Sequence, residues 1–150
     1  MPYQQFNTIF TSTPSFPLVH SQCTINETNM DSPLHTICLD EGIEYSYIHA
    51  YYADQYLPNV NWTECECPLS GNNIHYTNIT MTFQTTSNMF ITLDVCLYRG
   101  SINTKNNIIV GTNDLDENNV TINHYDLLMH FNTTMESVEL EQRENTGVWY

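Results

Sequence analysis

Apolar and polar positions alternate along much of this chain, and the clearest alternation predicts a β-hairpin. In residues 74–84 every second side chain is expected to face a core, which leaves Asn78 on the opposite, outward face. After the short polar loop 85–88, residues 89–98 repeat the same alternation. Two adjacent alternating segments joined by a short polar loop are typical of paired antiparallel strands.

Weaker alternation predicts several more strands, and the chain holds only two alanines, which argues against a helical protein. Residues 133–144 are ambiguous, because Thr133 and Glu136 have the spacing of a helix capping box while the residues after them alternate; we favour a strand. The proline-containing residues 1–22 predict an extended segment that packs as an edge strand. The other expected strands are residues 43–52, 107–111, 119–132 with a break near Asp126, and 146–150.

About seven short strands, each with one apolar face, must either pair two sheets face to face or close into a barrel. We expect the first arrangement, an all-β, two-sheet antiparallel β-sandwich that spans residues 1–150 as a single domain. A chain of this length can bury a sizeable core without a metal or cofactor.

The charge of the chain is strongly one-sided, with 17 acidic residues against three basic residues and a formal net charge of −14. Three scattered cations cannot neutralise a phosphate backbone, so nucleic acid is excluded as a partner, and anionic membrane surfaces are disfavoured for the same reason. No apolar stretch in the sequence is long enough to span a membrane. The charge instead favours a basic protein partner.

Cysteines and glycosylation sequons predict an oxidising, extracellular location. The five cysteines show no CxxC spacing, which favours disulfides over a redox motif or zinc site; since five is odd, at most two bridges form within the domain. The N-terminus carries no signal peptide, so we interpret the chain as a fragment excised from a larger secreted precursor. The cysteines are Cys23, Cys38, Cys65, Cys67 and Cys96, and the sequon asparagines are Asn26, Asn61, Asn78, Asn119 and Asn132.

The residue types that carry catalysis form no recognisable motif. Six histidines lack metal-ligand spacing, so neither a metal nor another cofactor is expected. Carboxylates cluster at residues 40–41, 64–66 and 114–117, but these segments are polar and turn-like, and acidic side chains there are usually solvated. We therefore expect that the chain is not an enzyme; an acidic-site hydrolase would need a pocket holding two close carboxylates.

The most distinctive stretch is a run of tyrosines within residues 45–56. Strand alternation would place Tyr45, Tyr47, His49 and Tyr51 on one face. Two interpretations are open. The run is either a core strand whose hydroxyls reach the rim, or a tyrosine-bearing face, flanked by acids, that recognises a basic protein.

Two stretches resemble a known family. Residues 30–45 (MDSPLHTICLDEGIEY) and 61–68 (NWTECECP) resemble the C-terminal domain of the orthopoxvirus secreted tumour-necrosis-factor receptor homologues. This domain, called the SECRET domain, is the chemokine-binding part of the cytokine response modifier B and D proteins. The resemblance implies a β-sandwich that sequesters chemokines, secreted in a precursor whose TNF-binding cysteine-rich modules precede it.

From the charge and this resemblance we expect a secreted viral decoy domain that binds host chemokines and blocks their receptor engagement. Acidic runs are no longer than two residues, so a sheet face is the expected binding platform rather than an acidic loop. The rival hypothesis is a structural or assembly module of a larger receptor homologue, which would self-associate and bind no chemokine. The candidate chemokine-binding residues are Glu44, Phe90, Asp94, Asp114, Asp116 and Glu117.

Overall fold

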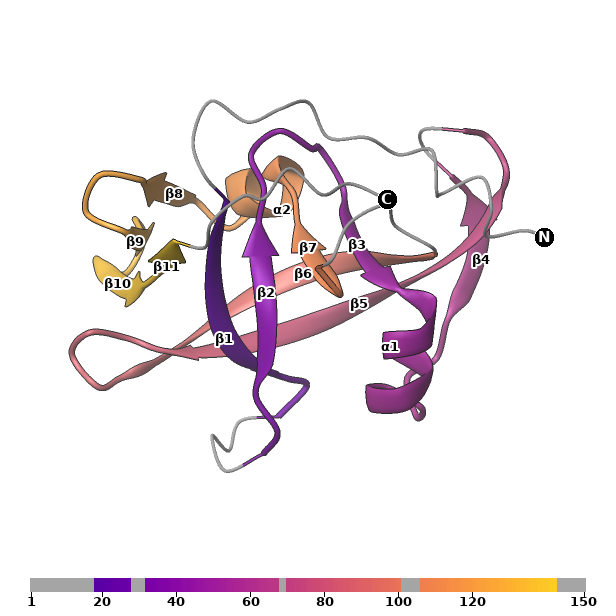
Figure 1. Cartoon of the computed structure of the whole chain (residues 1–150), viewed down its shortest axis with the longest axis horizontal. Coiled ribbons are helices and arrows are strands. Elements are labelled where there is room, and N and C mark those ends of the chain that lie inside the picture. Colours follow the sequence, from indigo (N-terminus) through magenta and orange to yellow (C-terminus); the bar gives the residue numbers. More distant parts are fainter. Residues whose placement is uncertain (1–17, 28–31, 68–69, 101–105, 143–150) are drawn as a thin grey trace.

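The predicted hairpin is the longest feature of the computed structural model (Figure 1). β5 (Asn73–Gln84) and β6 (Phe90–Gly100) pair antiparallel along almost their full lengths. Asn78 faces outward, and the alternate residues of β5 from position 77 to 83 are buried, as the alternation predicts. The structure describes residues 18–27, 32–67, 70–100 and 106–142.

Most of the other expected strands are confirmed. The strand at 107–111, the interrupted strand at 119–132 and a strand within 133–144 are all present, whereas residues 1–17 and 146–150 lie outside the described residues. The described end of the expected edge segment 1–22 belongs to a strand that pairs on both sides, with residues 35–39 and 141–142, so it is not an edge. The remaining strands are β1 (Val19–Ile25), β2 (His35–Leu39), β3 (Ser46–His49), β4 (Thr63–Glu66), β7 (Ile108–Val110), β8 (Val120–Asn123), β9 (Leu128–Phe131), β10 (Glu136–Glu139) and β11 (Glu141–Gln142), and the helices are α1 (Ala50–Tyr56) and α2 (Thr112–Glu117).

The chain is mostly β, as expected, but its strands close into a barrel instead of forming a two-sheet sandwich. The large sheet has the order β11-β1-β2-β7-β3-β6-β5-β4, and β1 also pairs with β5. Residues 19–23 of β1 pair with β2, whereas Thr24 and Ile25 pair with β5. Because β1 pairs with β2 along one part and with β5 along another, it closes a ring of six strands, and β11 and β4 lie outside this ring. β8, β9 and β10 form a separate small sheet, seen beside the barrel in Figure 1.

Two strand pairs in the barrel are parallel, which also departs from the expected antiparallel arrangement. These pairs are β2 with β7 and β3 with β6. In the first pair, Cys38 lies opposite Ile109 and Leu39 opposite Val110. The residues that follow both strands, Asp40 and Gly111, are therefore neighbours at the same end of the barrel.

The tyrosine run is divided between a strand and a helix, so the expected strand 43–52 is too long. The His49 side chain accepts a hydrogen bond from the Tyr51 backbone N–H at 3.2 Å and caps α1, which ends the strand at residue 49. Tyr47 is fully buried in the core, while Tyr51 is 80% exposed on the helix. Tyr47 is therefore a core residue, and Tyr51 is a surface residue.

The expected disulfides are not formed among the five cysteines, all of which lie within the described residues. Cys23 lies in the main barrel core, whereas Cys38 and Cys67 belong to a second buried cluster with Tyr47 and Ile109. Buried free cysteine behaves as a small apolar side chain. Packing, rather than cross-linking, explains these positions.

Burial also predicts that the thiols differ in reactivity. Desolvation raises the pKa of Cys23 to about 12. Because the thiolate is the reactive form, we expect iodoacetamide at about pH 8 to leave Cys23 unmodified in the folded protein and to alkylate it after denaturation. Mass spectrometry of chymotryptic peptides measures this difference, because cleavage after aromatic and leucine residues separates Cys23 from the other cysteines. Alkylation of Cys23 at equal rates in the folded and denatured protein would contradict it.

Candidate active site

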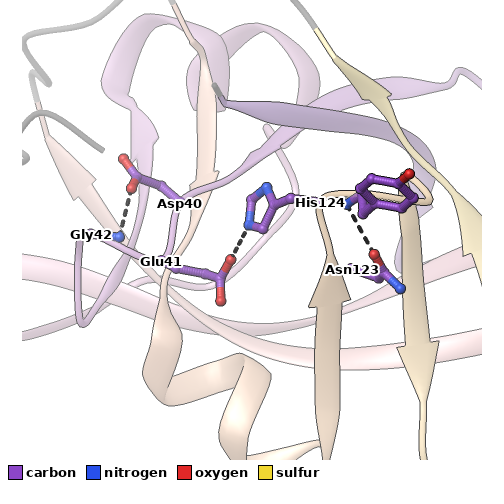
Figure 2. Close-up of polar contacts among 6 residues, drawn as sticks. Asp40, Glu41, Gly42, Asn123 and His124 are labelled. Carbon is purple, nitrogen blue, oxygen red and sulfur yellow. Dashed lines mark hydrogen bonds and ion pairs between the residues drawn. The ribbon is translucent and has the colours of Figure 1, made fainter. Parts of the chain in front are cut away.

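A buried carboxyl group follows the end of β2, in the turn formed by Asp40, Glu41 and Gly42 (Figure 2). The Asp40 backbone N–H donates to the Val110 carbonyl at 3.0 Å, which continues the pairing with β7 past the strand. Asp40 is only 1% exposed, and its Oδ1 accepts a hydrogen bond from the Gly42 N–H at 2.8 Å. Within the described residues, its Oδ2 is buried without a hydrogen-bond partner. Such an unsatisfied buried oxygen is costly and uncommon in folded proteins.

Three influences set the pKa of Asp40. Burial has the largest effect and raises the pKa, because desolvation disfavours the charged form. The Gly42 N–H lowers it, and the negative charge of Glu41 raises it again; the result is a pKa above the ordinary aspartate value. A carboxyl group with a raised pKa is a candidate for acid/base chemistry.

The second carboxylate of this turn, Glu41, points away from Asp40 toward the β8–β9 turn (Figure 2). Its Oε1 forms a hydrogen bond and ion pair with Nε2 of His124. The turn that carries His124 is fixed by Asn123, whose side-chain oxygen accepts backbone N–H groups from Tyr125 and the following residue, both at 2.9 Å. Glu41 is thus engaged by a different part of the chain, and Asp40 is the available carboxyl group of the turn.

A second network holds the loop that follows the Asp40 turn. The Ser46 hydroxyl donates to Asp114 Oδ2 and accepts the backbone N–H of Gly111 at 3.0 Å. The Cys96 backbone N–H donates to the other Asp114 oxygen at 3.1 Å. Burial raises the pKa of Asp114, and these two donors lower it. Asp114 is therefore a buried structural acceptor that ties α2 to β3 and β6.

Replacing Ser46 with alanine is expected to destabilise the fold by about 1–3 kcal/mol. The substitution removes the acceptor of the buried Gly111 N–H and a donor to Asp114. The free energy of unfolding in urea measures the loss. Ser87 is a matched control, because its hydroxyl donates to the Glu136 carboxylate at the surface; we expect Ser87→Ala to change stability by under about 0.5 kcal/mol. Equal effects of the two substitutions would contradict the prediction.

The structure brings together only some of the residues predicted to bind chemokines. Asp94, Asp114 and Glu117 line one shallow pocket of about 230 Å³ beside β5 and β6. Asp94 and Glu117 are exposed, but Asp114 is buried, so the expectation of an exposed turn acid is wrong there. The residues outside this pocket's lining are Glu44, Phe90 and Asp116, all of them exposed.

Other sequence expectations can be placed on the same structure. The five sequon asparagines are all exposed, which is compatible with glycosylation and does not test it. Among the described residues, no group of three or more His, Cys, Asp or Glu side chains could hold a metal ion. A search of the same part of the chain finds no helix long and apolar enough to cross a membrane.

The roles of Asp40 and His124 in this site are not evident from local sequence. The sequence predicts a solvated pair at Asp40 and Glu41, which is wrong for Asp40 because it directly follows a buried strand and its backbone continues the pairing with β7. The available signal was an apolar run that ends in Asp-x-Gly. His124 lies 83 residues from Glu41 and has no local signal that would connect the two.

Comparison with known proteins adds a likeness in fold. No family model matches the sequence, and no curated protein matches it. Among solved structures, the retroviral protease-like domain of Ddi1 from Leishmania major is similar, with a TM-score of 0.54 and 17% identity over 89% of this chain and 99% of that domain. At this identity the likeness shows a shared fold. The resemblance to the SECRET domain stays a prediction, and a fold shared with a protease-like domain gives no support to the expectation that the chain is not an enzyme.

Proposed function

We propose that this chain is one half of an aspartic peptidase, in which Asp40 residues from two copies of the chain together hydrolyse peptide bonds. The observation that carries the proposal is the buried Asp40 carboxyl group with its unpartnered Oδ2, at the end of a barrel similar to a retroviral protease-like domain. Aspartic proteases use two carboxyl groups that share one proton, because two adjacent carboxylates do not both ionise.

The second carboxyl group has to come from another copy of the chain. Among the described residues near the turn, Glu41 is engaged by His124, and Asp114 accepts hydrogen bonds from Ser46 and the Cys96 backbone. Neither is available to share a proton with Asp40. A two-fold dimer that brings two Asp40 turns together supplies a symmetric pair, and two-fold dimers are the commonest oligomers.

The chemistry of such a pair is a balanced hydrolysis. The ionised Asp40 takes a proton from water, the water oxygen attacks the peptide carbonyl carbon, and the protonated Asp40 of the other copy donates its proton to the carbonyl oxygen. As the intermediate collapses, one of its two hydroxyl groups returns a proton to the ionised Asp40, the C–N bond breaks, and the nitrogen receives the proton taken from water. A carboxylic acid and an amine are released, and the pair is restored with one shared proton. The raised pKa of Asp40 supports this role, because one member of the pair has to hold a proton at working pH.

The proposal is tested by incubating the purified chain with a mixed peptide library at several pH values below neutrality and identifying the products by mass spectrometry. Because two copies form the site, we expect the cleavage rate per chain to rise with protein concentration until dimerisation is complete. Sedimentation velocity measures the extent of dimerisation. Dimers without cleavage at any of these pH values, or cleavage whose rate per chain is independent of concentration in the monomer range, would exclude the proposed site.

A second candidate function, chemokine capture, is favoured by the charge distribution. Asp94, Asp116 and Glu117 are exposed on β6 and α2 of a chain with a net charge of −14, which supports steering of basic proteins toward this face. Secretion, a viral origin and association with cysteine-rich receptor modules in the same precursor belong to this hypothesis and stay predictions. The rival assembly module also stays a prediction.

Capture is tested with the immobilised domain and a panel of basic chemokines at low and high salt. We expect the double charge reversal Asp116→Lys, Glu117→Lys to slow association several-fold, while reversal of Glu64, an exposed acid on β4, has a smaller effect. Binding to no member of the panel would exclude this function and leave the peptidase proposal untouched.

A further inference from the structure

Aromatic rings gather on one side of α1, within the tyrosine run for which the sequence allows both a core and a surface interpretation. Tyr52 and Tyr56 pack together at 4.5 Å between ring centroids, and His49 stacks on Tyr51 at 5.4 Å with an interplanar angle of 22°. Tyr51 is 80% exposed and Tyr56 is 45% exposed. Tyr51 and Tyr56 are thus presented to solvent, whereas Tyr52 is partly buried and packs against the barrel core.

These rings line a shallow pocket of about 320 Å³, completed by two amide side chains. His35, which is not part of the lining, supports it: its ring makes edge contacts with Tyr52 and Tyr56, both at 5.7 Å, and its Nδ1 is hydrogen-bonded to the Tyr52 hydroxyl at 2.6 Å. The pocket is therefore preorganised by packing. Its lining residues are His49, Tyr51, Tyr52, Gln55, Tyr56 and Asn107.

The electrostatics of this pocket suit a cation. The face of an aromatic ring is negative and attracts a cation placed over it. Burial lowers the pKa of both His35 and His49, which favours their neutral forms at neutral pH. Arg99, the basic residue that the structure describes, is already committed to Asp54 and to the ring of Trp62 at 5.3 Å. The net charge of −14 adds a long-range attraction for a basic partner.

We propose that this pocket, here called the α1 tyrosine pocket, binds the guanidinium group of an arginine side chain on a basic partner protein. Arginine fits better than lysine, because its planar guanidinium stacks on aromatic rings and its five N–H groups can donate to the side-chain oxygens of Gln55 and Asn107. This inference goes beyond the peptidase proposal, since none of its residues belongs to the Asp40 turn.

The direct test is a titration of the ¹⁵N- and ¹³C-labelled chain with N-acetyl-arginine methylamide at fixed ionic strength, followed by NMR. The uncharged, nearly isosteric citrulline derivative is the ligand control. We expect saturable shifts of the ring signals of Tyr51, Tyr52 and Tyr56 with arginine and none with citrulline. Equal shifts with both compounds would overturn the proposal, and tighter binding of tetramethylammonium than of arginine would overturn the assignment of a guanidinium.

Two variants separate this pocket from general attraction to an acidic protein. Tyr51→Ala removes an exposed ring without opening the core, and we expect it to weaken arginine binding about two- to fivefold. Tyr51→Phe keeps the ring and should bind within a factor of about two of the native chain. Tyr125, 96% exposed in the β8–β9 turn, is the matched control, and Tyr125→Ala should leave binding unchanged. Equal losses in Tyr51→Ala and Tyr125→Ala would overturn the assignment.

Discussion

Replacing Asp40 with asparagine is expected to lower peptide hydrolysis by about 10²- to 10⁴-fold while raising the stability of the fold at neutral pH. Asparagine keeps the shape of the side chain and an oxygen that can accept the Gly42 N–H, but it has no acidic proton to give or take. Activity should therefore be lost without loss of the barrel. The measurements are initial cleavage rates and the free energy of unfolding in urea for both proteins.

The gain in stability follows from the direction of the pKa shift. Burial raises the pKa of Asp40 in the folded state above its value in the unfolded chain. The folded protein then favours the protonated form, so the contribution of Asp40 to stability is complete below the unfolded-state pKa and is lost as pH rises through the folded-state pKa. Asp40→Asn avoids the cost of ionisation, so its advantage over the native chain should appear with rising pH and be absent in acid.

Asp94→Asn is the matched control for both measurements, because Asp94 is an exposed carboxylate that accepts a hydrogen bond from the Thr80 hydroxyl. It should leave cleavage unchanged and show no comparable gain in stability with pH. If the Asp40→Asn protein cleaves peptides at the native rate, Asp40 takes no part in the reaction. A loss of stability in Asp40→Asn at neutral pH would instead show that the carboxylate is structurally required.

Local pattern was sufficient to predict much of the fold. The alternation in 74–84 and 89–98 defines β5 and β6 because a strand with one buried face needs an apolar residue at every second position. The break predicted near Asp126 is the turn between β8 and β9, where Leu127 has a positive φ of 55°. These features depend on neighbours a few residues apart, which a single sequence displays directly.

Closure of the barrel and the burial of Asp40 both depend on long-range contacts that the sequence does not display. β1 closes the ring of strands because its last two residues, Thr24 and Ile25, leave β2 and pair with β5, and no change in alternation marks that point. Asp40 is buried where β2 continues its pairing with β7, a strand distant from it in the sequence. From the sequence alone, Asp40 is therefore predicted to be a solvated turn acid. In the structure, its carboxylate accepts a hydrogen bond from the N–H of Gly42, two residues later.

Gly111→Ala is expected to destabilise the fold by about 3 kcal/mol and to disturb the Asp40 turn. A Cβ at this position would lie 2.6 Å from the Tyr45 carbonyl oxygen and 2.7 Å from that of Glu44, so the backbone of one loop has to move. The N–H groups of Thr112 and Asn113 donate to the Ile43 and Glu44 carbonyls at 2.9 Å, which resists such a shift.

Gly71 provides the control for this substitution. A Cβ at Gly71 would meet no atom within 4 Å, and its φ of +74° makes Gly71→Ala cost about 1 kcal/mol from backbone strain alone. The free energies of unfolding of the two variants in urea compare the cost of a steric clash, in Gly111→Ala, with the cost of backbone strain, in Gly71→Ala. Because the displaced loop begins right after the Asp40 turn, Gly111→Ala should also reduce cleavage by more than its loss of folded protein explains, whereas Gly71→Ala should not. A Gly111→Ala protein as stable as Gly71→Ala would show that the loop yields freely and does not hold Asp40 in place.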